Sequence, residues 1–235
     1  MKIKSLFSLV VLFFILIGCS TSKQSLGPST NFSQICDYET AVFQVVINKK
    51  GIEKNIGSGF FVQHNYKGDI YIAPLTAKHI ATQYMYNSNI KAFIKWKGKK
   101  FKIKSSSLIS KKHDIALLKI DKKILLKVNY KIGTEIKTTD SFTIPNFGNY
   151  SFINYDKSIP FISKAYYTGK RHTKNSLFLF NADNIVSKAS GSPVILNNSC
   201  YISGMLLSKH KNLKLVQVLP MGIIKQLLDQ HNEKY

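Results

Sequence analysis

Cysteine is scarce in this sequence, and the motifs that hold metals and nucleotides are missing. Only three cysteines occur among 235 residues, which is too few for a disulfide scaffold. No C-x-x-C or H-E-x-x-H pattern supplies a zinc ligand set, and neither a G-x-G-x-x-G fingerprint nor a P-loop is present. We therefore expect no metal ion and no organic cofactor.

Acidic residues are also scarce, and arginine is almost absent. The chain has 12 Asp and Glu against 34 Lys and Arg, a formal net charge of +22, and Arg171 is its single arginine. Recognition of base edges relies on the two-pronged guanidinium of arginine, whereas lysine supplies a point charge. The lysines are spread along the chain. This favours a generic basic surface, suited to anionic partners such as lipid head groups, over a nucleic-acid site.

Long hydrophobic runs are missing except near the N-terminus. Two lysines there precede an apolar run over residues 6–17. The run is too short for a transmembrane helix and is typical of a secretory signal peptide. The segment Leu16-Ile17-Gly18-Cys19 that ends it resembles the lipobox of bacterial lipoproteins. That resemblance implies that Cys19 is lipidated and becomes the first mature residue. An ordinary secretory peptide and an uncleaved anchor are the alternatives.

A polar linker follows the predicted signal. It is rich in Ser, Thr, Gln, Gly and Pro, a composition typical of flexible segments. The chain thus divides into a lipoprotein signal peptide over 1–18, a lipidated cysteine with its linker over 19–35, and a folded domain over 36–235. We expect the folded domain to lie close to a membrane without being part of it.

The predicted signal also indicates the compartment. We expect a lipid-anchored, extracytoplasmic protein of the bacterial cell envelope, on the periplasmic side or at the cell surface. That space is oxidising, and Cys36 and Cys200 are the only cysteines left after Cys19. They form either a disulfide bond or a pair of buried free thiols.

From residue 40 onward the sequence predicts strands. Short runs of β-branched and aromatic residues alternate with turn residues, a pattern typical of sandwiches and barrels. The segment Lys97-Gly98-Lys99-Lys100 separates two such runs and predicts a hairpin. A polar stretch near 121–134 divides the strands into two groups. Only the last segment, over 221–230, repeats apolar residues at the spacing of a helix.

Three short segments carry residues that suit nucleophilic catalysis, and they supply His79, Asp114 and Ser190 in that order. A histidine, an aspartate or a serine alone is more often structural than catalytic. Together they are informative, because a serine hydroxyl needs a general base, and a carboxylate can hold that base in one tautomer. Other histidines, His64 among them, are expected in polar loops or at the C-terminal end.

These segments resemble those of bacterial trypsin-like serine proteases. The resemblance spans residues 40–231 and implies an all-β fold of two six-stranded antiparallel β-barrels of the chymotrypsin type, with a short C-terminal α-helix. It includes glutamyl endopeptidases near the serine and HtrA-type protease domains near the C-terminus. The matching segments are Gly57-Ser58-Gly59-Phe60-Phe61-Val62, Thr76-Ala77-Lys78-His79, Asp114-Ile115-Ala116-Leu117-Leu118, Ser190-Gly191-Ser192-Pro193-Val194 and Val218-Leu219-Pro220.

The resemblance implies how the domain is organised and what it does. The first lobe covers about 36–125, the second about 130–220, and the C-terminal helix about 221–231, with the catalytic residues in the cleft between the lobes. The activity implied is that of a serine endopeptidase acting on protein or peptide substrates. A pseudoprotease, weak or inactive and used as a surface binding module, is the alternative.

The same resemblance assigns roles to four residues. Ser190 is the nucleophile, His79 the general base, and Asp114 the group that orients the histidine. The backbone N–H groups of Lys188 and Ser190 form the oxyanion hole. The family has glycine where this chain has Lys188, and a positive φ at a non-glycine residue costs about 1–2 kcal/mol. Of the differences from the family, Lys188 is therefore the one that most threatens the activity, because it can prevent the oxyanion hole from forming.

The primary specificity pocket is predicted from position alone. The sixth residue before Ser190 is Asn184, where an aspartate would indicate cleavage after lysine or arginine. The strand carrying Leu206 and Leu207 lacks the histidine of glutamate-specific relatives. An apolar wall at these leucines predicts a neutral side chain in the pocket. The other interpretation is that they pack inside the barrel.

Overall fold

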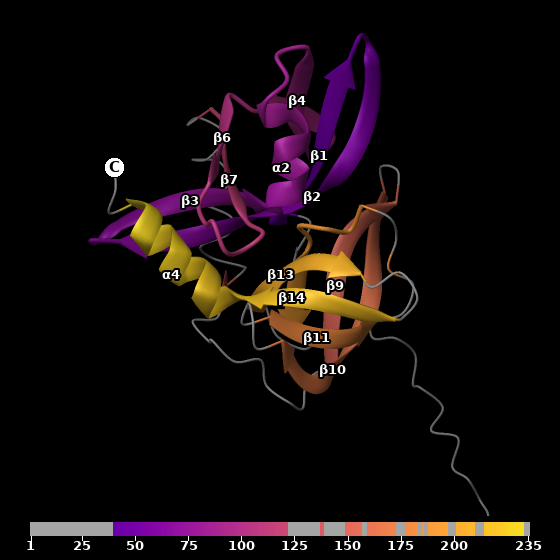
Figure 1. Ribbon diagram of the computed structural model, residues 1–235, viewed down its shortest axis with the longest axis vertical. Coiled ribbons are helices and arrows are strands. Elements are labelled where there is room, and N and C mark those ends of the chain that lie inside the picture. The colour runs from indigo at the N-terminus through magenta and orange to yellow at the C-terminus, as the bar shows by residue number, and fades with distance from the viewer. Residues whose placement is uncertain are drawn as a thin grey trace, which may run out of the picture. The chain divides into compact units, whose positions relative to one another are not determined.

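The computed structural model describes residues 40–121, 137–138, 149–156, 159–172, 177–182, 185, 188–196, 201–209 and 214–232. Within these ranges the chain is mostly β, with two seven-stranded sheets and two helices (Figure 1). The predicted signal peptide and linker lie outside the described residues. None of the helices found in these ranges has the length and apolar character needed to cross a membrane.

The first sheet forms the first lobe. Its strands pair antiparallel in the order β5-β4-β1-β2-β3-β7-β6. In the described residues the outer strands β5 and β6 do not pair, so this sheet curls into a half-barrel instead of the closed barrel expected from the sequence. The strands are β1 Val42–Lys49, β2 Ile52–Tyr66, β3 Asp69–Thr76, β4 Ile90–Trp96, β5 Lys99–Lys102, β6 Ser105–Leu108 and β7 Ala116–Lys119.

Lysine–glycine pairs form three of the hairpin turns in this lobe. In Lys50-Gly51, Lys67-Gly68 and Lys97-Gly98, φ is 46–53° at lysine and 73–88° at glycine. Positive φ at both central residues is typical of a type I′ turn, whose twist matches that of the strands it joins. The hairpin that the sequence predicts between β4 and β5 is confirmed, because the turn closes a two-residue loop.

The second sheet closes into a barrel. Its order is β12-β9-β10-β11-β14-β13-β8, and an additional pairing of β12 with β13 joins the two ends of a six-stranded ring. The short β8 lies outside the ring, parallel to β13. The strands are β8 Lys137–Thr138, β9 Asn149–Asp156, β10 Ile159–His172, β11 Leu177–Ala182, β12 Pro193–Leu196, β13 Tyr201–Lys209 and β14 Leu215–Pro220.

Each sheet has its own aromatic core. In the first lobe the ring of Phe61 lies 4.8 Å from that of Phe43 and 5.7 Å from that of Trp96. In the barrel, Phe152 and Phe180 meet edge to face at 6.1 Å. All four phenylalanines are fully buried. Burial of each phenylalanine side chain contributes about 1.5–3 kcal/mol, so both lobes have a core that stabilises them.

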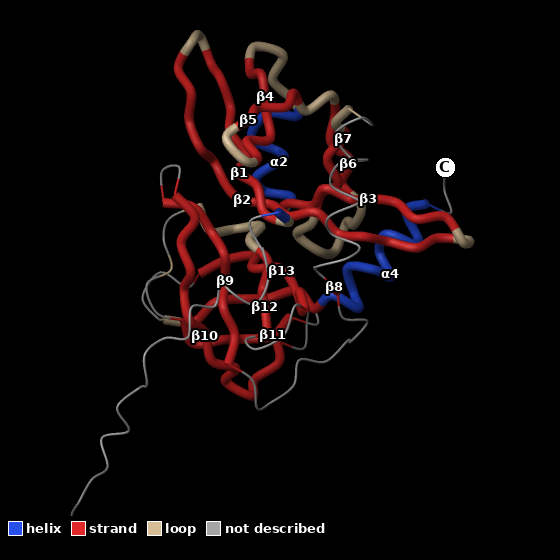
Figure 2. The backbone as a smooth tube through the Cα atoms, turned by 180° about the vertical axis from the view of Figure 1, so that it is seen from behind, coloured by secondary structure: helices blue, strands red, loops and turns tan. Residues whose placement is uncertain are grey.

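The predicted C-terminal helix is confirmed as α4 (Met221–Asn232). It begins directly after Pro220 and packs on β13, β14 and β2 (Figure 2). The expectation that His64 lies in a polar loop is wrong. His64 is on β2, is 4% exposed, and has its Nε2 3.1 Å from the Asp229 carboxylate of α4. The sequence pattern missed this because the contact joins residues 165 positions apart.

A second helix, α2 (Lys78–Met85), was not expected from the sequence. It has no side-chain cap at Ala77 and spans little more than two turns, so local signals are weak. Burial of Ile80, Ala81 and Tyr84 on one face stabilises it. Tertiary packing thus forms this helix, and it carries the first of the candidate site residues.

Candidate active site

His79 and Asp114 make two hydrogen bonds to each other. His79 is the second residue of α2, and Asp114 lies shortly before β7. The ring Nδ1 of His79 is 2.6 Å from Asp114 Oδ2, and the backbone N–H of His79 donates to Oδ1 at 2.9 Å. With Nδ1–H donating a hydrogen bond to the carboxylate, the proton of the neutral ring stays on Nδ1, and Nε2 is left as the basic nitrogen. This pair can therefore present an oriented base.

The environment of Asp114 keeps it ionised. Burial alone would raise the pKa of its carboxyl, but the side-chain hydrogen bond, the charge and the backbone N–H of His79, with the charge of Lys78, outweigh burial and lower the pKa. A carboxylate that accepts hydrogen bonds in its charged form resists protonation. Asp114 therefore stays negative opposite the histidine at neutral pH.

Ser190 lies in a tight turn between the lobes. The Ser192 N–H donates to the Ala189 carbonyl oxygen at 3.0 Å, and Gly191 has a φ of +87°. A positive φ at the third residue is typical of a type II turn, which puts Ser190 at the second. The Ser190 carbonyl oxygen accepts the Ser58 N–H from β2 at 3.0 Å. The turn is thus tied to the lobe that carries His79.

Gly191 cannot be replaced without moving the backbone. A Cβ at this position would lie 2.0 Å from the Ser58 carbonyl oxygen and 2.8 Å from Thr76 Oγ1. Its φ is also one that only glycine adopts readily. The first constraint comes from the close approach of the serine turn to strands β2 and β3, and the second from the turn itself. These constraints explain why glycine follows the serine in this fold.

Lys188 has the conformation that glycine usually provides. Its φ is +74°, and its carbonyl oxygen accepts the Ser58 hydroxyl at 3.2 Å. The other lysines with positive φ are in the Lys-Gly hairpin turns, where strand twist requires that conformation. Lys188 is in no such turn. A left-handed conformation at a non-glycine residue is strained, and such strain occurs mainly at functional sites, where surrounding contacts hold it.

Two backbone donors flank the serine. Within the described part of the chain, neither the Lys188 N–H nor the Ser190 N–H donates a hydrogen bond. Two backbone donors two residues apart are an arrangement that can bind a developing oxyanion. The Ser190 hydroxyl likewise makes no hydrogen bond to the His79 ring in these residues. Catalytic hydrogen bonds are often long before substrate binds.

Ser58 and Thr76 support the serine turn, and sequence reasoning gave neither of them a role. Ser58 binds the turn through its N–H and its hydroxyl, and Thr76 Oγ1 donates to the Ser58 carbonyl oxygen at 2.7 Å. Ser58 is fully buried, and so is Thr76. Both lie in the segments that resemble protease motifs, which was the available signal.

The remaining predicted site residues are placed as follows. Leu206 is 1% exposed within the core of the second barrel, and Leu207 is 3% exposed. Asn184 lies outside the described residues, as do the three cysteines predicted to carry the lipid or a disulfide bond, Cys19, Cys36 and Cys200.

Comparison with known proteins gives the fold. No protein family model and no curated protein matches the sequence. Among solved structures, a serine-to-alanine mutant of Rv3671c from M. tuberculosis H37Rv, in an inactive form, has a TM-score of 0.57 at 14% identity, over 87% of this chain and 92% of that one. The Rv3671c protease in its active form has a TM-score of 0.56 at 12% identity, over 82% and 81%.

A bacterial endoprotease is also similar in fold at low sequence identity. The serine endoprotease from Yersinia pestis has a TM-score of 0.60 at 16% identity, over 85% of this chain and 65% of that one. At such low identity these likenesses concern the fold alone. Together with the closed barrel, the curled half-barrel and the C-terminal helix, they show that this chain has the chymotrypsin-like fold, in structural kinship to trypsin-like serine proteases.

Proposed function

We propose that this chain is a serine endopeptidase that hydrolyses peptide bonds through an acyl-enzyme on Ser190. The observation that carries the proposal is the paired hydrogen bonding of His79 to Asp114, in a fold where the Ser190 turn is bonded to the same lobe. The left-handed conformation of Lys188 supports it, as do the N–H groups of Lys188 and Ser190, which donate no hydrogen bond among the described residues. No step of this chemistry needs a metal or an organic cofactor.

In the first step, Ser190 Oγ attacks the carbonyl carbon of the scissile bond while His79 Nε2 takes the hydroxyl proton. The C–N bond then breaks as Nε2 gives that proton to the leaving amine, and the acyl group stays on Oγ as an ester. Water attacks this ester with the same nitrogen as base, which releases the acid and restores the serine. Asp114 stays ionised and stabilises the imidazolium.

The oxyanion is bound by the two backbone donors. Negative charge develops on the carbonyl oxygen in the transition state, and the N–H groups of Lys188 and Ser190, which have no acceptor within the part of the chain that the structure describes, can donate to it. Removing one such donor costs about 10²–10³ in rate, so the conformation of Lys188 decides whether the enzyme is fast.

A serine-reactive phosphonate probe tests this function on the full-length chain. We expect covalent labelling of the wild type and none of Ser190→Ala. The matched control is Ser192→Ala in the same turn. Its hydroxyl is buried without a hydrogen-bond partner in the described residues, so that variant should still label. A second measurement, cleavage of a mixed peptide library by the wild type, is needed as well, because an esterase would also react with the probe.

Two outcomes contradict the proposal. If the wild type fails to label while its fold is intact, the protein is not an active serine enzyme, and the pseudoprotease acting as a binding module is favoured. If Ser190→Ala labels as well as the wild type, the reactive serine lies elsewhere in the chain.

We also propose that the enzyme is an extracytoplasmic lipoprotein of a bacterial envelope, tethered through Cys19. The basic start, the apolar run and the lipobox-like segment support this. Stable anchoring takes more than one acyl chain, which lipoprotein maturation supplies on one cysteine. We expect Cys19→Ser to leave the membrane fraction and to lose processing. If that variant still partitions fully with the membrane and is processed as before, the proposed lipid anchor on Cys19 is wrong.

A further inference from the structure

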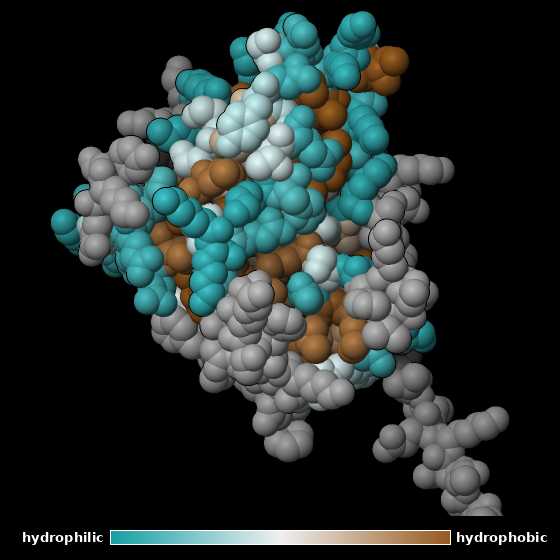
Figure 3. Space-filling model, in the orientation of Figure 1, coloured by the Kyte–Doolittle hydropathy of each residue, from teal (hydrophilic) through white to brown (hydrophobic). Residues whose placement is uncertain are grey.

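Two hydroxyl side chains are completely buried inside the first lobe, next to the serine turn. They belong to Ser58 on β2 and Thr76 at the end of β3, whereas the face of this lobe drawn in Figure 3 is largely hydrophilic. A hydroxyl group that leaves water needs a partner within the protein. Thr76 Oγ1 donates to the Ser58 carbonyl oxygen at 2.7 Å, and Ser58 Oγ donates to the Lys188 carbonyl oxygen at 3.2 Å. The hydrogen bonds thus lead from β3 through Ser58 to Lys188.

Ser58 contacts the serine turn in two chemically different ways. Its backbone N–H donates to the Ser190 carbonyl oxygen at 3.0 Å, a bond that any residue except proline could make. Its bond to the Lys188 carbonyl oxygen comes from the side chain and therefore requires a hydroxyl group. A serine at position 58 thus adds one specific contact, and that contact is with the residue that has the unusual backbone conformation.

Lys188 has few other contacts that could hold its φ of +74°. Its side chain is exposed, and its N–H donates no hydrogen bond within the described part of the chain. The free energy of a left-handed conformation at a non-glycine residue is similar in size to that of a hydrogen bond to a buried polar group. These two free energies oppose each other at Lys188. The hydroxyl bond from Ser58 can therefore decide which conformation Lys188 adopts.

The residues that follow Lys188 are anchored separately, in the second barrel. The Ala189 side chain is 2% exposed within the barrel core, and the Gly191 N–H donates to the Leu206 carbonyl oxygen at 2.7 Å. Neither contact involves Lys188. Losing the hydroxyl bond should therefore leave Ser190 in place, while rotation about the backbone bonds of Lys188 turns its N–H to another direction.

We propose that Ser58 is a positioning residue for the oxyanion hole. Its hydroxyl group holds Lys188 in the left-handed conformation, and this conformation presents the Lys188 N–H to the carbonyl oxygen of the substrate. Ser58 acts through Lys188 and does not touch the substrate. The role rests on the proposed endopeptidase function of Ser190, and it makes the oxyanion hole dependent on the contact between β2 and the serine turn.

Replacing Ser58 with alanine removes the hydroxyl group and keeps the backbone N–H. In the full-length chain acting on one peptide ester, we expect kcat to fall about tenfold, because relief of the left-handed strain leaves only a minor fraction of molecules with the oxyanion donor in place. KM should stay within twofold, since the donor acts mainly in the transition state. Ser58→Cys, with a weak S–H donor, should behave alike and replaces the alanine variant if that one does not fold.

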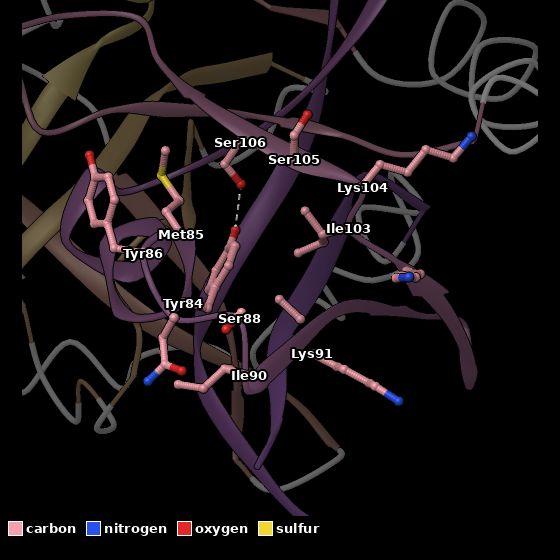
Figure 4. A pocket seen from close by; sticks show the side chains of 13 residues that line it. Tyr84, Met85, Tyr86, Ser88, Ile90, Lys91, Ile103, Lys104, Ser105 and Ser106 are labelled. Atoms are coloured by element: carbon pink, nitrogen blue, oxygen red, sulfur yellow. Dashed lines mark hydrogen bonds between the residues drawn. The ribbon is translucent and has the colours of Figure 1, made fainter.

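The matched control removes a serine hydroxyl from another part of the same lobe. Ser106 lines a pocket of about 680 Å³ at the C-terminal end of α2, and Figure 4 shows its hydrogen bond of 2.8 Å to the Tyr84 hydroxyl. None of the residues that line this pocket belongs to the serine turn. Ser106→Ala should therefore keep kcat within twofold of the wild type.

A double variant separates positioning from a general effect on the fold. Glycine adopts a positive φ without strain, so a glycine at position 188 no longer needs the hydroxyl bond. Compared with Lys188→Gly alone, Ser58→Ala/Lys188→Gly should lose less than threefold in kcat. A serine that only stabilised the fold would cost the same factor whether residue 188 is lysine or glycine.

The φ of Lys188 in a crystal structure of full-length Ser58→Ala is a readout that needs no activity. We expect φ to become negative while both hydrogen bonds between His79 and Asp114 remain. A φ still near +74°, or the same loss of kcat with lysine and with glycine at position 188, would overturn the proposal. A wild type that does not turn over the ester would instead contradict the proposed function, and the φ would still decide whether the hydroxyl group holds Lys188.

Discussion

Replacing Asp114 with asparagine is expected to lower turnover by about 10⁴-fold with the fold intact. The carboxylate accepts both the His79 backbone N–H and the ring Nδ1 proton. An asparagine fills the same space, but its NH₂ group donates. His79 would then accept at Nδ1 and carry its proton on Nε2, where it cannot take the proton of Ser190.

A matched control separates this effect from a general loss of charge. Asp69→Asn removes an aspartate at the exposed β2–β3 hairpin whose carboxylate, among the described residues, accepts a hydrogen bond from the Tyr71 hydroxyl alone, and it should leave turnover unchanged. Turnover of both variants is measured on one peptide ester, with Ser190→Ala as the blank. A loss of less than tenfold in Asp114→Asn would remove Asp114 from the catalytic residues.

The lowered pKa of Asp114 gives this variant a second signature. A carboxyl whose pKa is lower in the folded state contributes stability above its unfolded value, and that stability is lost as pH falls through the folded pKa. Asparagine does not titrate. The melting temperature of Asp114→Asn should therefore fall less steeply on acidification than that of the wild type.

Local patterns in the sequence predicted the hairpin and the terminal helix, because each depends on neighbouring residues. The Lys97-Gly98 turn follows from the backbone freedom of glycine, and α4 follows from apolar spacing after Pro220. The short helix α2 could not be predicted, since it lacks a cap and depends on burial of Ile80 and Tyr84 in a lobe built from distant strands. The same holds for the pairing of His64 with α4.

The candidate site divides in the same way. Residue types and order singled out His79, Asp114 and Ser190, but their mutual positions depend on contacts between strands far apart in the sequence. The Ser58 contacts with residues 188 and 190 are of this kind. The open side of the first lobe was also beyond local patterns, because it depends on whether β5 and β6 pair.

Replacing Lys188 with glycine and with proline should show whether turnover depends on the backbone conformation at this position or on the lysine side chain. With a φ of +74° already present, Lys188→Gly supplies nothing that the backbone lacks, so we expect turnover within about threefold of the wild type. Lys188→Pro fixes φ near −65° and removes the N–H, so it should lose the oxyanion donor and about 10²–10³ in rate. The side chain is exposed, so neither change opens a cavity.

Lys188→Ala is the control for the side chain, because it keeps the N–H and the strained φ. It should match Lys188→Gly in turnover on the same ester. Glycine removes a left-handed strain of about 1–2 kcal/mol but also loosens the unfolded chain by about 0.5–1 kcal/mol, so its melting temperature should stay level or rise slightly. A gain of 10²-fold in Lys188→Gly would contradict a preformed hole, because glycine would then be restoring a donor that lysine holds away from the substrate.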